Sequence, residues 1–308
     1  MRTARTRARR ALVALAGGSE QQSTGPGAGV PPDRGPGAPV DNPHRRSAAE
    51  EPRAEKPERS GKRRLPPDFD EVSRSVIPLV RGYTMTGPDK LHALISAVQY
   101  VAKAGIPGAF VECGVWRGGS MHAVARTLDL CGVHDRDLYL FDTFQGMTEP
   151  TTRDRMVGQQ DVTAADLMQE SSKESRLWAI ASKEDVLDGL STLPYPQDRF
   201  HLVEGPVEDT VPGGAPEQIA LLRLDTDWYE STRHELEHLY PRLQPGGILI
   251  IDDYGSWQGS KEATDEYVAA LTEPLLLMRA GRSRIAVKPG LVVPDPRPDA
   301  TPDPRRND

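Results

Sequence analysis

The sequence predicts an α/β fold built on one mostly parallel sheet, and three observations lead to this prediction. From about residue 88 onward, short apolar runs alternate with runs that show helical periodicity. An alternating order of strand and helix produces parallel strands that are joined by right-handed crossovers. The last two apolar runs are separated by too few residues for a crossover helix, so we expect them to form an antiparallel hairpin.

Each predicted element follows from a local pattern. A helix is predicted over 88–105, because apolar residues recur there at helical spacing and Pro88 suits a first turn. Further helices are predicted at 120–128, 231–243 and 261–271. Strands are predicted at 109–113, 137–142, 199–205, 219–225 and 247–253, and the closing hairpin is formed by PLLLMRA and SRIAVKP. The prediction is thus a seven-stranded sheet with one antiparallel strand and helices on both faces, the architecture of Rossmann-like class I methyltransferases.

The two ends of the chain differ in composition from the middle. Residues 1–65 hold fourteen Lys/Arg against seven Asp/Glu, are rich in Pro and Gly, and lack apolar periodicity. We predict that 1–65 and the tail 291–308 are disordered and flank a folded domain at 66–290. The net charge of the whole chain is −7, so residues 66–308 carry about −14, which argues against binding to nucleic acid or to an anionic membrane.

The first twenty residues partly resemble an export signal. Their apolar stretch, ALVALAGG, is as short as the shortest such signals and lacks a clear cleavage site. No apolar run approaches the length that spans a membrane. Cys113 and Cys131 both have apolar neighbours and form no disulfide framework, so we expect a soluble protein in a reducing cytoplasm.

A long polar segment, 143–198, separates the second and third predicted strands and contains FQGMTEPTT. An insertion of this size near the carboxyl ends of the strands is a candidate lid. The alternative is a pair of helices on the surface without a role in the site.

Residues 234–238 read HELEH, which fits the H-E-x-x-H pattern of zinc proteases. On a helical wheel the apolar stripe is formed by leucines and Tyr240, whereas His234 and His238 lie on the opposite face. Gln244 and Ile248 occupy the positions where the extended motif has glycine and histidine. We therefore expect these histidines to face solvent and to bind no catalytic zinc.

The stretch VECGVWRGGS follows the first predicted strand, where nucleotide-binding loops occur. Trp116 stands where a dinucleotide loop has its second glycine, which argues against NAD and FAD. The helix N-terminus near 118–120 suits a carboxylate, Glu112 suits an ammonium group, and Asp142 suits a ribose diol. Each signal is common without a ligand, but together they favour S-adenosylmethionine as cofactor.

Four aspartates follow two strands that should be neighbours. Asp225 and Asp227 end the fourth strand, and Asp252 and Asp253 end the fifth, so all four should meet at the ligand crevice. Carboxylates this close repel one another unless a cation lies between them. Oxygen ligands suit a hard cation, Mg²⁺ first and Mn²⁺ or Ca²⁺ next. The alternative is that the aspartates only form turns and helix caps.

These motifs, together with others along the chain, resemble one family. The stretches ECGVWRGGS, FDTFQGMTEPT, VEDTVP, LRLDTDWYEST and LYPRLQPGGILIIDDYG are similar to those of the TylF-like macrocin O-methyltransferases, which methylate deoxysugar hydroxyls of macrolide and aminocoumarin antibiotics. The resemblance covers about residues 80–288. It implies a homo-oligomeric enzyme that depends on Mg²⁺ (or Mn²⁺) and S-adenosylmethionine and acts on a small-molecule hydroxyl acceptor, a sugar.

The resemblance also implies site residues. It assigns metal binding to Asp225, Asp252 and Asp253 and the role of general base to Asp227. Its cofactor contacts are Glu112, Gly114, Ser120 and Asp142, with Glu208 and Asp209 near the adenine and Thr84 and Met85 near the methionine end.

Three other readings remain open from the sequence. A related metal-dependent enzyme could methylate a catechol-like acceptor, whose lower pKa needs less assistance. A protein that binds S-adenosylmethionine without catalysis could retain the fold, although binding alone does not require a base beside a metal. An NAD oxidoreductase is disfavoured by Trp116.

Overall fold

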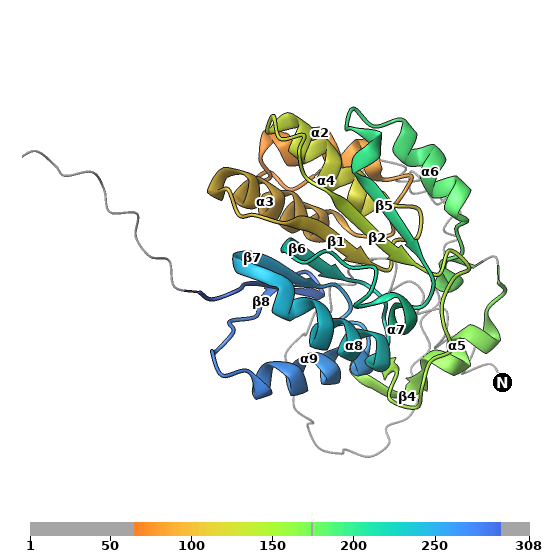
Figure 1. Ribbon diagram of the computed structural model, residues 1–308. Helices are drawn as coiled ribbons and strands as arrows, with labels where there is room; N and C mark the ends of the chain where they lie inside the picture. Colours follow the sequence, from red (N-terminus) through yellow and green to blue (C-terminus); the bar gives the residue numbers. More distant parts are fainter. Residues whose placement is uncertain (1–64, 174, 291–308) are drawn as a thin grey trace, which may run out of the picture. The chain divides into compact units, whose positions relative to one another are not determined.

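The computed structural model describes residues 65–173 and 175–290. The two ends predicted to be disordered lie outside these residues, apart from Leu65. The described residues contain a seven-stranded sheet in the order β5-β2-β1-β6-β7-β9-β8 (Figure 1). The strand bounds are β1 Ala109–Cys113, β2 Leu138–Asp142, β5 Phe200–Glu204, β6 Ile219–Leu224, β7 Leu243–Ile251, β8 Met278–Ala280 and β9 Ser283–Val287.

The directions of the strands confirm the predicted fold class. Strands β5, β2, β1, β6 and β7 are mutually parallel, whereas β9 runs antiparallel to both β7 and β8. The closing hairpin is therefore β8–β9, as its short connection predicts. Every residue of β1 and of β6 is buried, which fits strands that are covered on both faces.

Helices cover the sheet on both faces (Figure 1). One face carries α2 (Glu71–Val80), α3 (Pro88–Ala104), α4 (Gly119–Leu130) and α6 (Lys183–Ser191). The other face carries α7 (Val207–Thr210), α8 (Tyr229–Leu239) and α9 (Gln258–Ala270). None of the helices in the described part of the chain combines the length and apolarity needed to cross a membrane.

Several elements differ from the sequence prediction, which includes neither α7 nor any of the strands and helices between β2 and β5, and which starts β7 at 247 instead of Leu243. Helices α2 and α8 show the physical reasons. Helix α2 is not among the predicted helices. It begins after Asp70, whose side chain accepts a hydrogen bond from the Ser73 amide, and Pro78 interrupts the apolar pattern that would have indicated it. Helix α8 ends at Leu239, because Pro241 lacks the N–H that would continue the helix, and a 3₁₀ turn over Tyr240–Arg242 leads into β7 instead.

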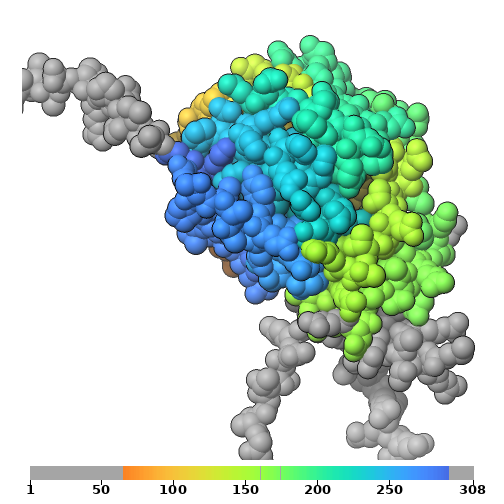
Figure 2. Space-filling view, turned by 60° about the horizontal axis from the view of Figure 1, so that its bottom comes forward, coloured from red at the N-terminus to blue at the C-terminus, as the bar shows by residue number. Residues whose placement is uncertain are grey.

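The segment 143–198 contains α6, which is the crossover between β2 and β5, and a smaller inserted unit. That unit comprises β3 (Arg155–Met156), β4 (Gln159–Thr163), α5 (Ala164–Glu170) and a 3₁₀ turn (Arg176–Trp178). In Figure 2 its yellow-green surface lies against the cyan and blue surface of the C-terminal half.

A separate apolar cluster holds the inserted unit in place. Met156 and Leu167 pack in this cluster with Trp228 and Trp257, which precede α8 and α9. Buried Asp154 adds a polar connection, because its carboxylate accepts hydrogen bonds from the Tyr229 amide at 2.8 Å and the Thr151 amide at 2.7 Å. The inserted unit is therefore attached to the layer that contains α8 and α9.

Candidate active site

A cavity opens at the carboxyl ends of the parallel strands, where ligands bind in open α/β sheets. Its walls come from the loops after β1, β2, β5, β6 and β7, the loop before α3, and the inserted unit. The wall residues of the inserted unit and of the loop before it are Thr143, Gly146, Met147, Thr148, Arg176, Leu177 and Ala179.

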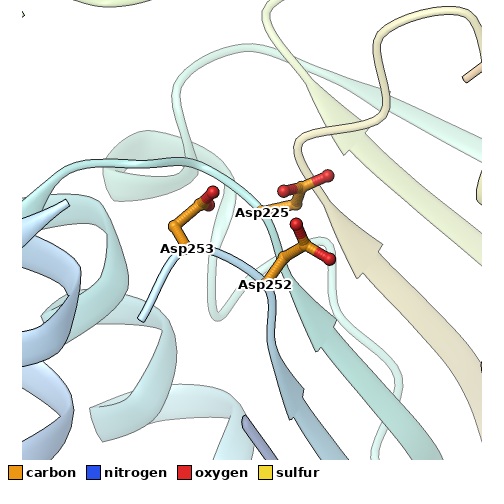
Figure 3. Close-up of side chains that lie close together, drawn as sticks. All are labelled: Asp225, Asp252 and Asp253. Atoms are coloured by element: carbon orange, nitrogen blue, oxygen red, sulfur yellow. The ribbon is translucent and has the colours of Figure 1, made fainter. Parts of the chain in front are cut away.

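Three aspartates converge on one side of this cavity. The pairing of Leu224 with Ile251 sets Asp225 beside Asp252 at the ends of β6 and β7. One carboxylate oxygen of each of Asp225, Asp252 and Asp253 lies within 4.8 Å of the other two. Figure 3 shows the three side chains directed toward a common space. The geometry thus provides a set of three oxygen ligands.

Asp227 lies next to this set and also lines the cavity. Its amide donates a hydrogen bond to Asp253 Oδ2 at 3.2 Å. Its backbone has φ 69°, a left-handed value that is unusual for a residue with a side chain. Burial, and then the charge of Asp225, raise the pKa of the Asp227 carboxyl to about 7.

A buried guanidinium already neutralises part of the acidic cluster. Arg223 donates hydrogen bonds to Asp225 Oδ2 and Asp252 Oδ1, both at 2.7 Å, and also forms a short ion pair with Glu112. Lys90 Nζ lies 2.5 Å from Asp252 Oδ2. Burial raises the pKa of Asp252, but the two cations outweigh it, so this carboxyl titrates below its usual range. Burial with less compensation raises the pKa of Asp225 and Asp253.

The sequence analysis did not identify Arg223 or Lys90 as part of the site. Arg223 carried a signal, because a charged residue within the buried run IALLRL requires partners inside the protein. Lys90 had no comparable signal, since a single lysine in the first turn of a helix is ordinary. Only the tertiary structure brings it to the end of β7.

The predicted cofactor loop is held by Asp142. Its Oδ2 accepts hydrogen bonds from the amides of Val115 and Trp116, at 2.6 and 2.9 Å, and its Oδ1 accepts one from Phe144 at 2.8 Å. Both carboxylate oxygens are therefore engaged by the backbone. Asp142 lines the cavity, but its contacts in this structure are with the loop.

Gly114 explains how closely this loop approaches β6. A Cβ atom built at Gly114 would lie 2.1 Å from the Asp225 carbonyl oxygen, and the residue has φ 82°. Only glycine fits such an approach and such a backbone angle. The loop after β1 and the first aspartate of the cluster are thus held in contact.

The remaining predicted cofactor residues divide into two groups. Met85 and Glu208 line the cavity together with Gly114 and Asp142. The residues that are not part of the lining are Thr84, Glu112, Ser120 and Asp209. These four residues therefore lie outside the cavity wall, and their roles as cofactor contacts stay predictions.

Glu112 lies below the cavity floor. It is opposite Arg223 in the β1–β6 register, is buried, and receives a hydrogen bond from the Ser120 side chain as well as from Arg223. Burial raises its pKa to about 7 although Arg223 opposes the shift. Its Oε2 atom has no hydrogen-bond partner among the described residues, which leaves an acceptor free for a donor.

The two histidines of HELEH lie outside this cluster. His234 and His238 are half-buried rather than exposed, with ring centroids 4.4 Å apart. His234 Nε2 donates a hydrogen bond to the Val211 carbonyl at 3.0 Å. Neither belongs to the group of residues that could hold a metal. Glu235, which directly follows His234, is fully buried.

A mostly parallel seven-stranded sheet with this strand order, and a ligand cavity at its carboxyl ends, define a class I methyltransferase. The model of the macrocin O-methyltransferase (TylF) family matches residues 43–278. The chain belongs to this family and is an S-adenosylmethionine-dependent O-methyltransferase.

Two relatives and one solved structure give the extent of the similarity. The chain is 36% identical over 185 residues to the 8-demethyl-8-(2,3-dimethoxy-alpha-L-rhamnosyl)-tetracenomycin-C 4'-O-methyltransferase of Streptomyces olivaceus, across 60% of this chain and 67% of the relative. It is 34% identical over 192 residues to the mycinamicin III 3''-O-methyltransferase of Micromonospora griseorubida, across 60% of this chain and 70% of the relative. The structure of the O-methyltransferase NovP matches with a TM-score of 0.57 and 31% identity, over 68% of this chain and 83% of that chain.

Proposed function

We propose that this enzyme transfers the methyl group of S-adenosylmethionine to a sugar hydroxyl of a glycosylated natural product, with Mg²⁺ or Mn²⁺ as a second cofactor. The observation that carries this proposal is the convergence of four aspartates on one cavity of a methyltransferase fold. The names of the relatives, a rhamnosyl tetracenomycin 4'-O-methyltransferase and a mycinamicin 3''-O-methyltransferase, support a sugar acceptor.

The residues present fit a hard divalent cation. Asp225, Asp252 and Asp253 offer only oxygen atoms, and no histidine or cysteine belongs to the group. Arg223 and Lys90 neutralise part of its charge, while burial and the neighbouring carboxylates keep the pKa of Asp225 and Asp253 raised, so an added cation would favour their charged forms. When bound, such a cation would supply Lewis-acid chemistry that lowers the pKa of a neighbouring hydroxyl.

Asp227 is the candidate general base, because it lines the cavity directly beside the three proposed ligands. Its pKa of about 7 lies well below that of an alcohol. With the value of about 15.7 for water as a guide, the gap is about 9 units, or roughly 12 kcal/mol. General-base catalysis contributes about two to four orders of magnitude, which covers less than half of this gap. A base and a Lewis acid are therefore expected to act together.

The methyl donor is proposed to lie on the side of the cavity formed by Met85, Gly114, Asp142 and Glu208. The acceptor then faces the inserted unit and the loop before it, which contribute the apolar side chains of Leu177 and Met147. This unit is the proposed lid. We also propose that the enzyme is a homo-oligomer and that it lies in the cytoplasm. The two free cysteines support the cytoplasm, because a reducing compartment keeps thiols unpaired.

The experiment is a transfer assay with methyl-labelled S-adenosylmethionine. The acceptors are a panel of rhamnosylated and deoxysugar-bearing natural products, and simple catechols are the comparison. We expect label in a sugar hydroxyl, loss of transfer with EDTA and recovery with Mg²⁺. Methylation of catechols but not of sugars would refute the acceptor assignment. Cofactor binding without transfer to any acceptor would favour a noncatalytic role.

A further inference from the structure

Asp227 lies at the centre of a tight turn with an unusual backbone conformation. The Trp228 amide donates a hydrogen bond to the Thr226 carbonyl at 2.8 Å, which closes a three-residue γ-turn around Asp227. With φ 69° at its central residue, this is the rare and strained form of the γ-turn. A strained conformation persists only where the surrounding structure holds it.

Several hydrogen bonds hold the turn, and Thr226 takes part in two of them, through its carbonyl and through its hydroxyl. The Asp227 amide is bonded to Asp253, and Ser231 Oγ donates a hydrogen bond to the Trp228 carbonyl at 3.2 Å. The Thr226 hydroxyl donates a hydrogen bond to Glu235 Oε1 at 3.0 Å. Glu235 lies on α8 and approaches the turn from below.

Burying the carboxyl group of Glu235 costs free energy, because a buried polar atom without a hydrogen bond destabilises the fold. Its side chain is fully buried, and its other oxygen, Oε2, has no hydrogen-bond partner among the described residues. Burial raises the pKa of Glu235 well above its usual range, although the Thr226 hydrogen bond opposes the shift. The cavity is lined by Thr226, Asp227 and Ser231 but not by Glu235, so Glu235 does not touch a ligand.

We propose that Glu235 is a positioning residue for methyl transfer: through its hydrogen bond to Thr226 it holds the strained turn that directs Asp227 into the cavity. The proposal rests on the assignment of Asp227 as general base. It also gives a role to the glutamate of HELEH, whose histidines do not reach the site.

The test compares Glu235→Leu, Glu235→Gln, Thr226→Val and the double variant Thr226→Val/Glu235→Leu. Glu235→Leu removes the acceptor for Thr226, and we expect kcat to fall about 10- to 100-fold, the size of a small misplacement of a reacting group. The KM for S-adenosylmethionine should stay within about twofold of wild type. Glu235→Gln keeps an oxygen acceptor for the Thr226 hydroxyl and should recover most of kcat. The double variant should be no slower than the slower single variant, because both changes remove the same contact.

Two further measurements separate positioning from a merely structural role. Amide hydrogen exchange in a peptide that covers 225–228 should be faster in Glu235→Leu than in Glu235→Gln. The midpoint of thermal unfolding should not fall in parallel with kcat, since an apolar side chain suits the buried location. The matched control is Glu237→Gln, an exposed glutamate two residues along the same helix, which should leave kcat and loop exchange unchanged.

A Glu235→Leu enzyme with wild-type kcat below its unfolding temperature would overturn the proposal. If Glu235→Leu does not fold, wild-type kcat in Thr226→Val overturns it equally. Failure of the base assignment gives a different result: Asp227→Asn would then retain turnover, whatever the Glu235 variants do.

Discussion

Arg223 and Asp252 form a buried ion pair at 2.7 Å, and the same guanidinium lies 2.7 Å from Asp225. Arg223 thus joins the ends of β6 and β7 from inside the sheet, below the cavity. Because it also pairs with Glu112 on β1, one side chain connects three neighbouring strands. The acidic cluster is therefore held together before any ligand binds.

Replacement of Arg223 by Met should destabilise the fold strongly. It would leave buried Glu112 and Asp252, and half-buried Asp225, without their main cation, and breaking a buried pair in this way costs about 3–5 kcal/mol. Urea unfolding measures the effect. Arg233→Gln is the control, because it removes an exposed pair with Glu237 on α8 and should change stability very little. Equal stabilities of the two variants would contradict a central role for Arg223.

Asp227→Asn should lower kcat by about two to four orders of magnitude, because an amide does not accept the proton of the hydroxyl. Calorimetry should show S-adenosylmethionine binding close to wild type, since Asp227 is not among the residues proposed to hold the cofactor. A variant with undiminished turnover would remove the base assignment.

Asp253→Asn should weaken Mg²⁺ binding at least about tenfold, because it removes one of the three proposed oxygen ligands. Isothermal titration of the chelator-treated protein with MgCl₂ measures this directly, without an activity assay. Asp265→Asn is the matched control, since Asp265 lies outside the group and pairs with Lys261 on α9. Identical Mg²⁺ affinities of wild type and Asp253→Asn would exclude a metal at this position.

The burial of His122 should lower the free energy of unfolding of the protein in mild acid. Burial, and then nearby Arg126, lower the pKa of its imidazole to about 4 from about 6.5 in the unfolded chain. The unfolded chain therefore binds a proton that the native state excludes. The stabilising contribution is complete above about pH 6.5, declines as the pH falls and is lost near pH 4, with a total of about 3 kcal/mol.

Denaturant unfolding between pH 4 and pH 7 measures this contribution. His122→Phe keeps a ring to stack on Tyr83, whose centroid lies 4.3 Å away, but it does not titrate. Its stability should therefore depend less on pH than that of wild type over this range. Parallel pH profiles would show that His122 is not responsible for the acid sensitivity.

Asp154→Ala should loosen the inserted unit. The change leaves the buried Tyr229 amide without an acceptor, at a cost of roughly 1–3 kcal/mol, and it also removes the acceptor of the more exposed Thr151 amide. We expect faster tryptic cleavage after Arg153 and Arg155, which mass spectrometry follows. We also expect the KM for the acceptor to rise more, relative to wild type, than the KM for S-adenosylmethionine. Unchanged cleavage and an unchanged acceptor KM would contradict the role of this unit as a lid.

Much of the fold could be predicted, because the strands have a strong local signal. The run AFVEC is a strand with the predicted bounds, and the short connection between the last two apolar runs correctly indicated a hairpin. Helix α2 could not be predicted in the same way, since Pro78 lies within it and its amphipathic run is short. Helix α8 ends at Leu239, before the predicted end at 243, because Pro241 cannot continue a helix even though the apolar pattern runs on.

The candidate site was predictable where residues follow strand ends. Asp225, Asp252 and Asp253 could be placed together, because the ends of adjacent parallel strands meet at one edge. The contacts of Asp142 were not predictable. Its oxygens bond the amides of its own loop and of the loop after β1, and such bonds depend on backbone geometry that spacing does not specify.

By itself, the sequence determined the order of strands and helices, the family, and the set of aspartates at the strand ends, because these follow from periodicity and from local motifs. The tertiary structure alone decided which charges meet. Arg223 and Lys90, separated by more than a hundred residues, both reach Asp252, and Glu235 reaches Thr226 beneath the cavity. The physical reason is that a buried charge or hydrogen bond depends on distance and burial in three dimensions, which packing establishes only when the whole sheet is assembled.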